Sequence, residues 1–174
     1  MPKIVVMRVG DGPLRGQVES YISRHRLPNV VMAGYVPDTV LPRYYCSADI
    51  FCAPATGAES FGIVLLEALA SGLPVVATEV EGYMSVLEPG RDSLTVQPKG
   101  WAELGSALII LARDAELRRR MGAYGREKAG RFGWDVVAAE ILEVYEEARE
   151  ARAASATREA QVVQVEELNV HDAV

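Results

Sequence analysis

Two carboxylates, Glu59 and Glu67, are the residues whose type and spacing best suit chemistry in this chain. They flank the start of an otherwise apolar helix, for which Ser60 is the expected N-cap and Gly72 followed by Pro74 the expected stop. At about 1.5 Å of rise per residue, the two acids lie roughly 10 Å apart along the helix axis. One ligand as long as a sugar–diphosphate–ribose unit would reach both.

The first turn of this helix is the second chemical feature. It has free backbone N–H groups, no acidic side chain, and a glycine that lets a ligand approach the backbone closely. Its residues are Phe61, Gly62, Ile63 and Val64. An anion would fit there. The residues alone also allow a simpler interpretation, in which Glu59 favours the positive end of the helix dipole and Glu67 is a partly exposed helix acid.

Composition limits the classes of protein that fit. The 174 residues are 49% hydrophobic and 24% charged, as expected for a globular chain with a real core. The net charge is −6 and the basic residues are dispersed, which argues against a nucleic-acid partner. Cys46 and Cys52 are expected to be buried reduced thiols, and we find no metal-ligand spacing. No apolar run approaches the ~18 residues of a membrane span, so we expect a cytoplasmic protein.

The elements that must position the two acids follow an alternating pattern of short apolar strands and amphipathic helices. The expected strands are residues 3–9, 30–33, 50–53, 74–78 and 93–96. The strand at 74–78 is nearly all apolar, as in a sheet covered on both faces. We therefore predict an α/β fold with a doubly wound parallel sheet, in which the acids follow the third strand.

The first turn of the chain does not indicate a dinucleotide site. Gly10, Gly12 and Gly16 give the spacing G-x-G-x-x-x-G, which differs from the G-x-G-x-x-G fingerprint, and Pro13 interrupts it. No acidic residue ends the second strand, where a ribose partner would be expected. A nicotinamide or flavin enzyme is therefore not favoured.

At the residue level, the segments 59–68 (ESFGIVLLEA) and 71–78 (SGLPVVAT) resemble the signature of group 1 (family 4) retaining glycosyltransferases of GT-B fold. Residues 9–14, 48–50 and 132–134, and Gly90, also fall in the order typical of that family. Within the family, residues 52–54 joined to 57–65 are most similar to phosphatidylinositol mannosyltransferases. The resemblance implies a Rossmann-like, nucleotide-sugar-binding domain over residues 1–134, a crossover helix at 135–150, and a frayed helix or disordered tail at 151–174.

The resemblance also implies a role for each site residue. Glu59 would bind hydroxyls of the donor sugar and serve as the catalytic carboxylate, and Glu67 would bind the ribose, because each carboxylate can accept two adjacent hydroxyl hydrogens. The first helical turn would hold the sugar and diphosphate and stabilise the charge on the leaving diphosphate. The base of the nucleotide would lie near Tyr35, Val36 and Pro37. This scheme needs no metal or other cofactor. GDP-mannose is the favoured donor, and UDP- and ADP-sugars stay open.

Paired carboxylates also occur in glycoside hydrolases, where they flank the scissile bond about 5 to 10 Å apart. Here both acids come from one loop and helix beside a free helix N-terminus, an arrangement that suits a phosphate-bearing ligand better.

The chain departs from the family pattern in three places. We expect the N-terminal acceptor-binding domain to be missing. The donor-binding domain should open with a strand-helix unit that carries Gly-Arg and Lys-Gly segments, and we expect this unit to be missing too, since Lys3 and Arg8 do not match those segments. Residues 81–85 (EGYMS) replace a Gly-Gly motif followed by an acid. The 174 residues alone are therefore expected to bind donor weakly and to transfer no sugar. The alternatives are a non-catalytic nucleotide-sugar-binding module and an inert remnant. The missing domain would receive a lipid or glycan acceptor and could associate peripherally with the inner face of a membrane.

Overall fold

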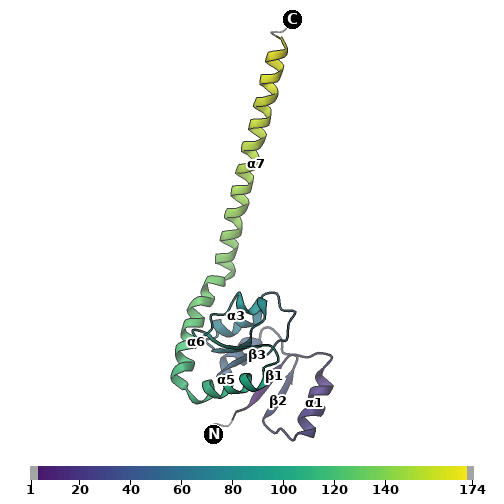
Figure 1. Cartoon of the computed structure of the whole chain (residues 1–174), viewed down its shortest axis with the longest axis vertical. Helices are drawn as coiled ribbons and strands as arrows, with labels where there is room; N and C mark the ends of the chain where they lie inside the picture. The colour runs from purple at the N-terminus through teal and green to yellow at the C-terminus, as the bar shows by residue number, and fades with distance from the viewer. Residues whose placement is uncertain (1–3, 172–174) are drawn as a thin grey trace. The chain divides into compact units, whose positions relative to one another are not determined.

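The computed structural model describes the backbone of residues 4–171 and the side chains of residues 4–155. The chain divides into two compact units, the first ending at Gly130 and the second starting at Arg131, and each is described here by itself. Parallel strands and helices alternate along the first unit. In chain order its elements are β1 (Val6–Val9), α1 (Arg15–Arg24), β2 (Val30–Gly34), α2 (Leu41–Ser47), β3 (Phe51–Ala53), α3 (Ile63–Ala70), β4 (Val75–Thr78), α4 (Glu81–Met84), β5 (Ser93–Val96), α5 (Trp101–Arg113) and α6 (Ala115–Ala129) (Figure 1). The predicted α/β class with parallel strands is thereby confirmed.

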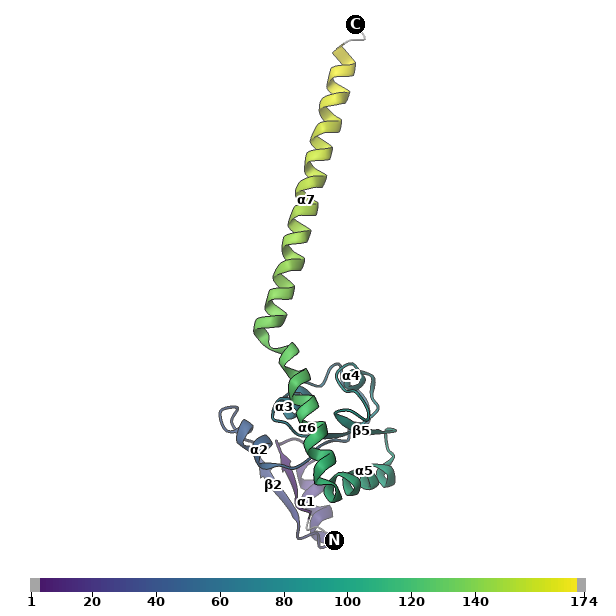
Figure 2. The same ribbon diagram turned by 90° about the vertical axis from the view of Figure 1, so that its left-hand side faces the viewer.

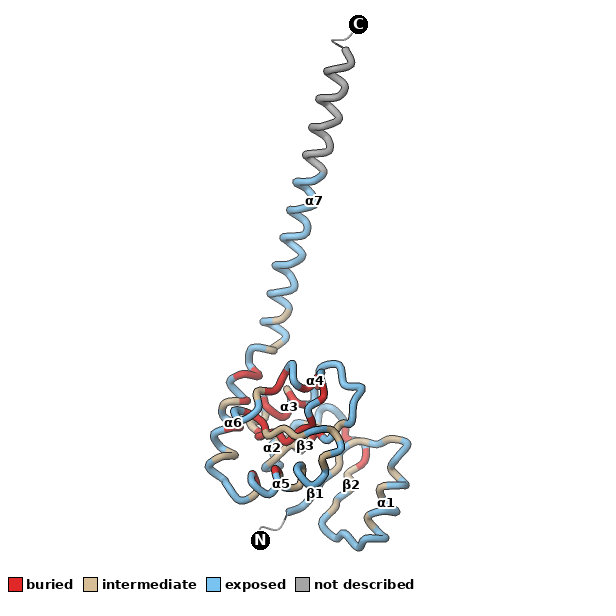
Figure 3. Tube along the Cα trace, in the orientation of Figure 1, coloured by how far each residue is buried: buried red, intermediate tan, exposed pale blue. Residues whose placement is uncertain are grey.

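The strands described in the structure form two parallel sheets. One pairs β1 with β2, with Val6 opposite Val30, and the other has the order β3-β4-β5, with Val76 between Cys52 and Leu94. β1 therefore has a hydrogen-bonded neighbour on one side only, and so has β3. The consequence is visible in Figure 3, where β1 is largely exposed although its sequence is mostly apolar, whereas every residue of β4 is buried.

Helices cover both faces of the β3-β4-β5 sheet. Side chains alternate between the faces of a strand, so Val75 and Ala77 face one way and Val76 the other. Val75 and Ala77 pack in one cluster with Leu65 and Leu69 of α3, whereas Val76 packs with side chains of α5 and α6. Figure 1 and Figure 2 both show α3 and α5 on opposite sides of this sheet. The doubly wound arrangement holds here.

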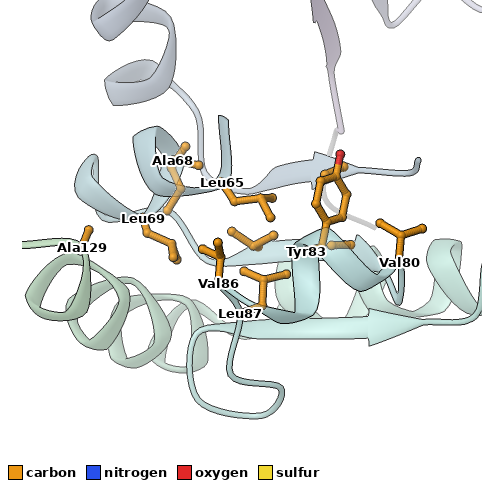
Figure 4. Packing of buried hydrophobic residues seen from close by; sticks show 12 residues of the cluster. Leu65, Ala68, Leu69, Val80, Tyr83, Val86, Leu87 and Ala129 are labelled. Carbon is orange, nitrogen blue, oxygen red and sulfur yellow. The ribbon is translucent and has the colours of Figure 1, made fainter. Parts of the chain in front are cut away.

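The larger cluster lies between α3, α4 and the sheet (Figure 4). Leu65, Ala68 and Leu69 are completely buried, and Tyr83 and Leu87 are nearly so. Burying a leucine side chain stabilises the fold by about 1.5 to 3 kcal/mol. This cluster therefore fixes α3 and its N-terminus firmly relative to β4.

Glycines let α6 approach α3 closely. A Cβ atom added at Gly122 would lie 2.1 Å from the carbonyl oxygen of Gly72, and one added at Gly125 would lie 2.5 Å from a methyl carbon of Leu69. Gly72 itself has φ = 77° and ends α3, as expected from the sequence. A larger residue at Gly122 would clash with backbone and move a helix, whereas one at Gly125 would require the Leu69 side chain to shift.

The second unit contains α7, which runs from Trp134 to His171. This single helix spans the residues for which a crossover helix was expected and, as far as residue 171, those for which a frayed helix or disordered tail was expected; residues 172–174 lie outside the described part. Ile141, Leu142 and Tyr145 of α7 are exposed. Among the residues that the structure describes, no helix is long and apolar enough to cross a membrane.

Candidate functional site

The loop after β3 holds an unusual backbone conformation. Between Ala53 and Ile63 the φ angles of Gly57, Ala58 and Gly62 are all positive, at 147°, 62° and 89°. Such a conformation costs a residue with a side chain, here Ala58, of the order of 1 to 3 kcal/mol, so the surroundings must hold it in place. One such contact comes from β4, where the buried Thr78 hydroxyl donates to the carbonyl oxygen of Ala55 at 2.5 Å.

The start of α3 corrects one prediction. The N-cap position is Gly62, in a left-handed conformation, and no side chain caps the first turn, so Ser60 is not the N-cap. Gly62 turns the chain sharply into the helix and leaves Ser60 outside it. Leu65 N–H donates to Gly62 O at 2.9 Å, which leaves the N–H groups of Ile63 and Val64 without an intrahelical acceptor. The predicted anion site at this turn is therefore compatible with the observed backbone.

Glu67 lies in the second turn of α3 and has a specific partner. The Tyr45 hydroxyl, on α2, donates to Glu67 Oε2 at 2.8 Å. The Tyr45 ring packs against Phe51 of β3, with centroids 5.6 Å apart. Burial and the bond to the Glu67 carboxylate raise the pKa of Tyr45 far above its ordinary value. Glu67 is thus an exposed acid held in one orientation, with one of its oxygens bonded.

Glu59 lies in the loop just before Gly62 and is exposed. Its backbone and carboxylate face α4, the helical turn formed by residues 81–84 in the segment that departs from the family pattern. At the start of α3, the side chain of Phe61 is about one-third exposed and that of Ile63 about two-thirds exposed. The structure therefore brings Glu59, the first turn of α3 and Glu67 together on one loop-helix segment, which we call the cradle (residues 59–67).

The residues expected near the base lie on another segment. Tyr35, Val36 and Pro37 follow β2, with Tyr35 exposed and the Val36 side chain buried. The carbonyl oxygen of Pro37 accepts hydrogen bonds from Val40 and Leu41, at 2.8 and 3.0 Å, and so starts α2. This turn therefore connects through α2 to Tyr45, the partner of Glu67, but its contact with a base stays a prediction.

Two tyrosines important to the cradle were not singled out from the sequence as site residues. Tyr45 and Tyr83 come from elements 22 residues before Glu67 and 24 residues after Glu59. Neither position lies in a local sequence pattern that predicts a partner so distant along the chain.

Alkaline pH provides a test of these tyrosine contacts. The pKa values of Tyr45 and Tyr83 are raised, that of Tyr83 to about 12, so both favour the folded state below pH 10 and lose this contribution as the pH rises from 10 towards 12. We expect urea unfolding at pH 8 and pH 11 to show a loss of stability that is smaller in Tyr45→Phe. Tyr44→Phe, on the same helix, is the matched control. An equal loss in Tyr45→Phe and the unmutated chain would contradict this.

Other features of the residues that the structure describes give no competing site. Within residues 4–171, no three His, Cys, Asp or Glu side chains are arranged to hold a metal ion. Both cysteines are free, and Cys46 is exposed, which corrects the expectation that both thiols are buried. An open hollow of about 520 Å³ lies between β5 and α5, bordered by Leu94, Ala107 and Ile110. Glu103 is the ionisable residue among those that line this hollow, so the hollow offers few groups for catalysis.

The sequence matches the family model described as "Glycosyl transferases group 1" over residues 1–128. The chain therefore belongs to the group 1 glycosyltransferases. Among characterised relatives, it is 39% identical over 143 residues to the phosphatidyl-myo-inositol mannosyltransferase of Mycobacterium leprae, covering 82% of this chain and 37% of the relative. With the enzyme of the same name from Mycobacterium tuberculosis it shares 38% identity over 152 residues, covering 83% and 39%. The chain thus spans about two fifths of the length of these relatives.

Solved structures agree with this assignment. The sucrose-phosphate synthase of Thermosynechococcus elongatus superposes with a TM-score of 0.76 at 28% identity, covering 83% of this chain and 38% of that one. Anabaena Alr3699/HepE, crystallised in complex with UDP, gives a TM-score of 0.75 at 25% identity, covering 84% and 42%. The predicted family and fold, the C-terminal domain of a GT-B glycosyltransferase, are confirmed.

Proposed function

We propose that this chain is the donor-binding half of a retaining glycosyltransferase, which transfers a hexose from a nucleotide-diphosphate sugar to a lipid or glycan acceptor. Mannose from GDP-mannose is the favoured hexose and donor, because the relatives are mannosyltransferases. The observation that carries the proposal is the cradle, in which an uncapped helix start lies between two exposed carboxylates. The UDP complex of Alr3699/HepE supports a nucleotide ligand of this kind.

Each part of the cradle has a distinct task in this proposal. Glu59 accepts hydrogen bonds from hydroxyls of the donor sugar, and Glu67 accepts them from the ribose. The backbone N–H groups from Phe61 to Val64 meet the sugar and the diphosphate. As the bond to the sugar breaks, negative charge grows on the diphosphate, and the positive end of the α3 dipole stabilises that charge. Tyr35, Val36 and Pro37 lie next to the base of the nucleotide.

The other half of the reaction belongs to a second domain. In our proposal, an N-terminal domain binds the acceptor and closes over the donor, and with a lipid acceptor that domain also meets the membrane surface. The cationic groups that would neutralise the diphosphate are not among the residues of the cradle. We therefore expect the 174 residues to bind donor weakly and to transfer no sugar. Sugar transfer by the purified chain without a partner would contradict this.

Titration of the chain with nucleotide sugars tests the proposal. We expect GDP-mannose to bind, and Glu67→Ala to weaken GDP-mannose and GDP together, because the ribose is common to both. Loss of one charge-assisted hydrogen bond worth about 1.5 to 3 kcal/mol corresponds to roughly a tenfold to hundredfold change. Glu116→Ala, at an exposed ion pair on α6, is the matched control. Calorimetry or ligand-observed NMR with GDP-, UDP- and ADP-sugars would measure the affinities.

The outcomes separate the alternatives. Binding of a nucleotide sugar with no transfer, even when the N-terminal domain is supplied, favours a non-catalytic binding module. No binding of any of the three nucleotides favours an inert remnant. Unchanged affinity in Glu67→Ala would show that the ribose assignment is wrong.

A further inference from the structure

The helical turn α4, which follows β4, is packed directly against the cradle. Gly82 and Tyr83 are its two buried residues, whereas Glu81 and Met84 point towards solvent. Gly82 contacts the Glu59 end of the segment from Glu59 to Gly62, and the Tyr83 ring contacts the Gly62 end. What these contacts do for the site depends on the proposed function above.

Gly82 contacts the backbone that carries Glu59. A Cβ atom added at Gly82 would lie 2.2 Å from the carbonyl oxygen of Glu59 and 2.6 Å from the carbonyl carbon of Ser60. Real Cβ atoms do not come so close to backbone atoms, so the two backbones touch with no room for a side chain. The position of the Glu59 backbone is therefore fixed by α4.

The Tyr83 ring contacts the other end of the segment, at Gly62. Its ring lies against Gly62, where an added Cβ atom would be 2.8 Å from Tyr83 Cδ1. The residue is only 3% exposed and belongs to the core cluster between α3 and the sheet (Figure 4). Burial, together with the neighbouring Glu59 carboxylate, raises the pKa of its hydroxyl to about 12. One side chain thus joins the core, the start of α3 and the exposed acid.

We propose that Tyr83 is the positioning residue for Glu59, with its ring fixed by the core and its hydroxyl directing the Glu59 carboxylate towards the donor sugar. Gly82 is required beside it because only a residue without a side chain lets α4 approach the cradle. Tyr83 has no contact with the ligand in this proposal and acts through Glu59. It therefore governs the part of the affinity that comes from the sugar and leaves the part that comes from the nucleotide unchanged.

Tyr83→Phe tests this, because it removes the hydroxyl and keeps the ring in the core. With the 174-residue chain, we expect the affinity for GDP-mannose to fall about fivefold to tenfold, while the affinity for GDP stays within about twofold. Tyr124→Phe is the matched control, since the Tyr124 hydroxyl also donates to a glutamate, Glu88, at 2.8 Å, but in another part of the fold. Its affinities for both ligands should match those of the unmutated chain.

Three results would overturn the positioning role. They are an unchanged affinity of Tyr83→Phe for GDP-mannose, an equal loss for GDP and GDP-mannose, and no preference of the unmutated chain for GDP-mannose over GDP. Gly82→Ala gives a second variant, which should lose more GDP-mannose affinity than Tyr83→Phe because it displaces the Glu59 backbone itself. Normal GDP-mannose binding by Gly82→Ala would also contradict the proposal.

A failure of the proposed function gives a different result. If the chain binds neither GDP nor GDP-mannose, the donor-binding function is wrong, but the contact can still be measured without a ligand. The carboxyl carbon of Glu59 should change its NMR chemical shift in Tyr83→Phe and not in Tyr124→Phe. An unchanged Glu59 signal in Tyr83→Phe would show that the hydroxyl does not position this acid.

Discussion

Lys128→Met is expected to destabilise the first unit by about 3 to 5 kcal/mol, a large part of the 5 to 15 kcal/mol by which typical domains are stable. Lys128 lies on α6 and is 7% exposed, and its ammonium group pairs with Asp92, which is completely inaccessible to solvent. It also donates to the carbonyl oxygen of Val86 at 2.6 Å. Removing the lysine leaves the Asp92 carboxylate buried without its counter-charge, and that uncompensated charge is the main cost.

Denaturant unfolding measured by circular dichroism would show this as a lower transition midpoint. Arg119→Met is the matched control, because Arg119 lies on the same helix but forms an exposed ion pair with Glu116. Exposed pairs contribute little, so its midpoint should hardly change. The double variant Lys128→Met/Asp92→Asn should recover part of the loss, because a neutral amide replaces the unpaired charge and can still accept from Glu88 N–H. Similar midpoints for Lys128→Met and Arg119→Met would contradict the assigned role of the pair.

The backbone amides of β1 are expected to exchange with solvent at least about a hundredfold faster than those of β4. β4 is buried throughout and has hydrogen-bonded strands on both sides, so its amides should exchange only when the whole unit unfolds. β1 has one neighbour, and Val6 and Met7 are about half exposed. In addition, α1, which follows β1, has no buried residue to hold it on a core. The β1-β2 pair should therefore open locally without unfolding of the rest.

Native-state exchange followed by NMR would measure both strands in one sample. The comparison of β1 (VMRV) with β4 (VVAT) is well controlled, because both are four-residue parallel strands rich in valine. Exchange rates within about tenfold of each other would contradict the expected difference.

Much of the secondary structure could be predicted because its signals are local. The expected strand at 93–96 matches β5, Ser93–Val96, and residues 30–33 became β2, Val30–Gly34, since short apolar runs between turn residues define buried strands. The N-cap of α6 is equally local, since the Asp114 side chain accepts from Leu117 N–H at 2.8 Å. In each case the interacting residues lie within a few positions of one another.

The site was predicted less completely, and the start of α3 shows why. The sequence favoured Ser60 as N-cap because serine is a common capping residue, but Gly62 takes that position in a left-handed conformation. Gly62 can adopt this conformation because it has no side chain, and the Tyr83 ring fills the space where one would be, so a larger residue could not take its place. Tyr83 lies 21 residues further along the chain, and no local pattern connects the two.

The sequence by itself determined the family, the alternation of strands and helices, and the two acids that flank the start of α3. These follow from residue types and spacings that act over a few positions, or from a signature that is contiguous in the chain. The tertiary structure decided the rest: the division of the strands into two sheets, the pairing of Lys128 with Asp92, the hydrogen bond from Tyr45 to Glu67, and the packing of α4 against the cradle. These depend on close packing between segments far apart in the chain, which only the folded core brings together.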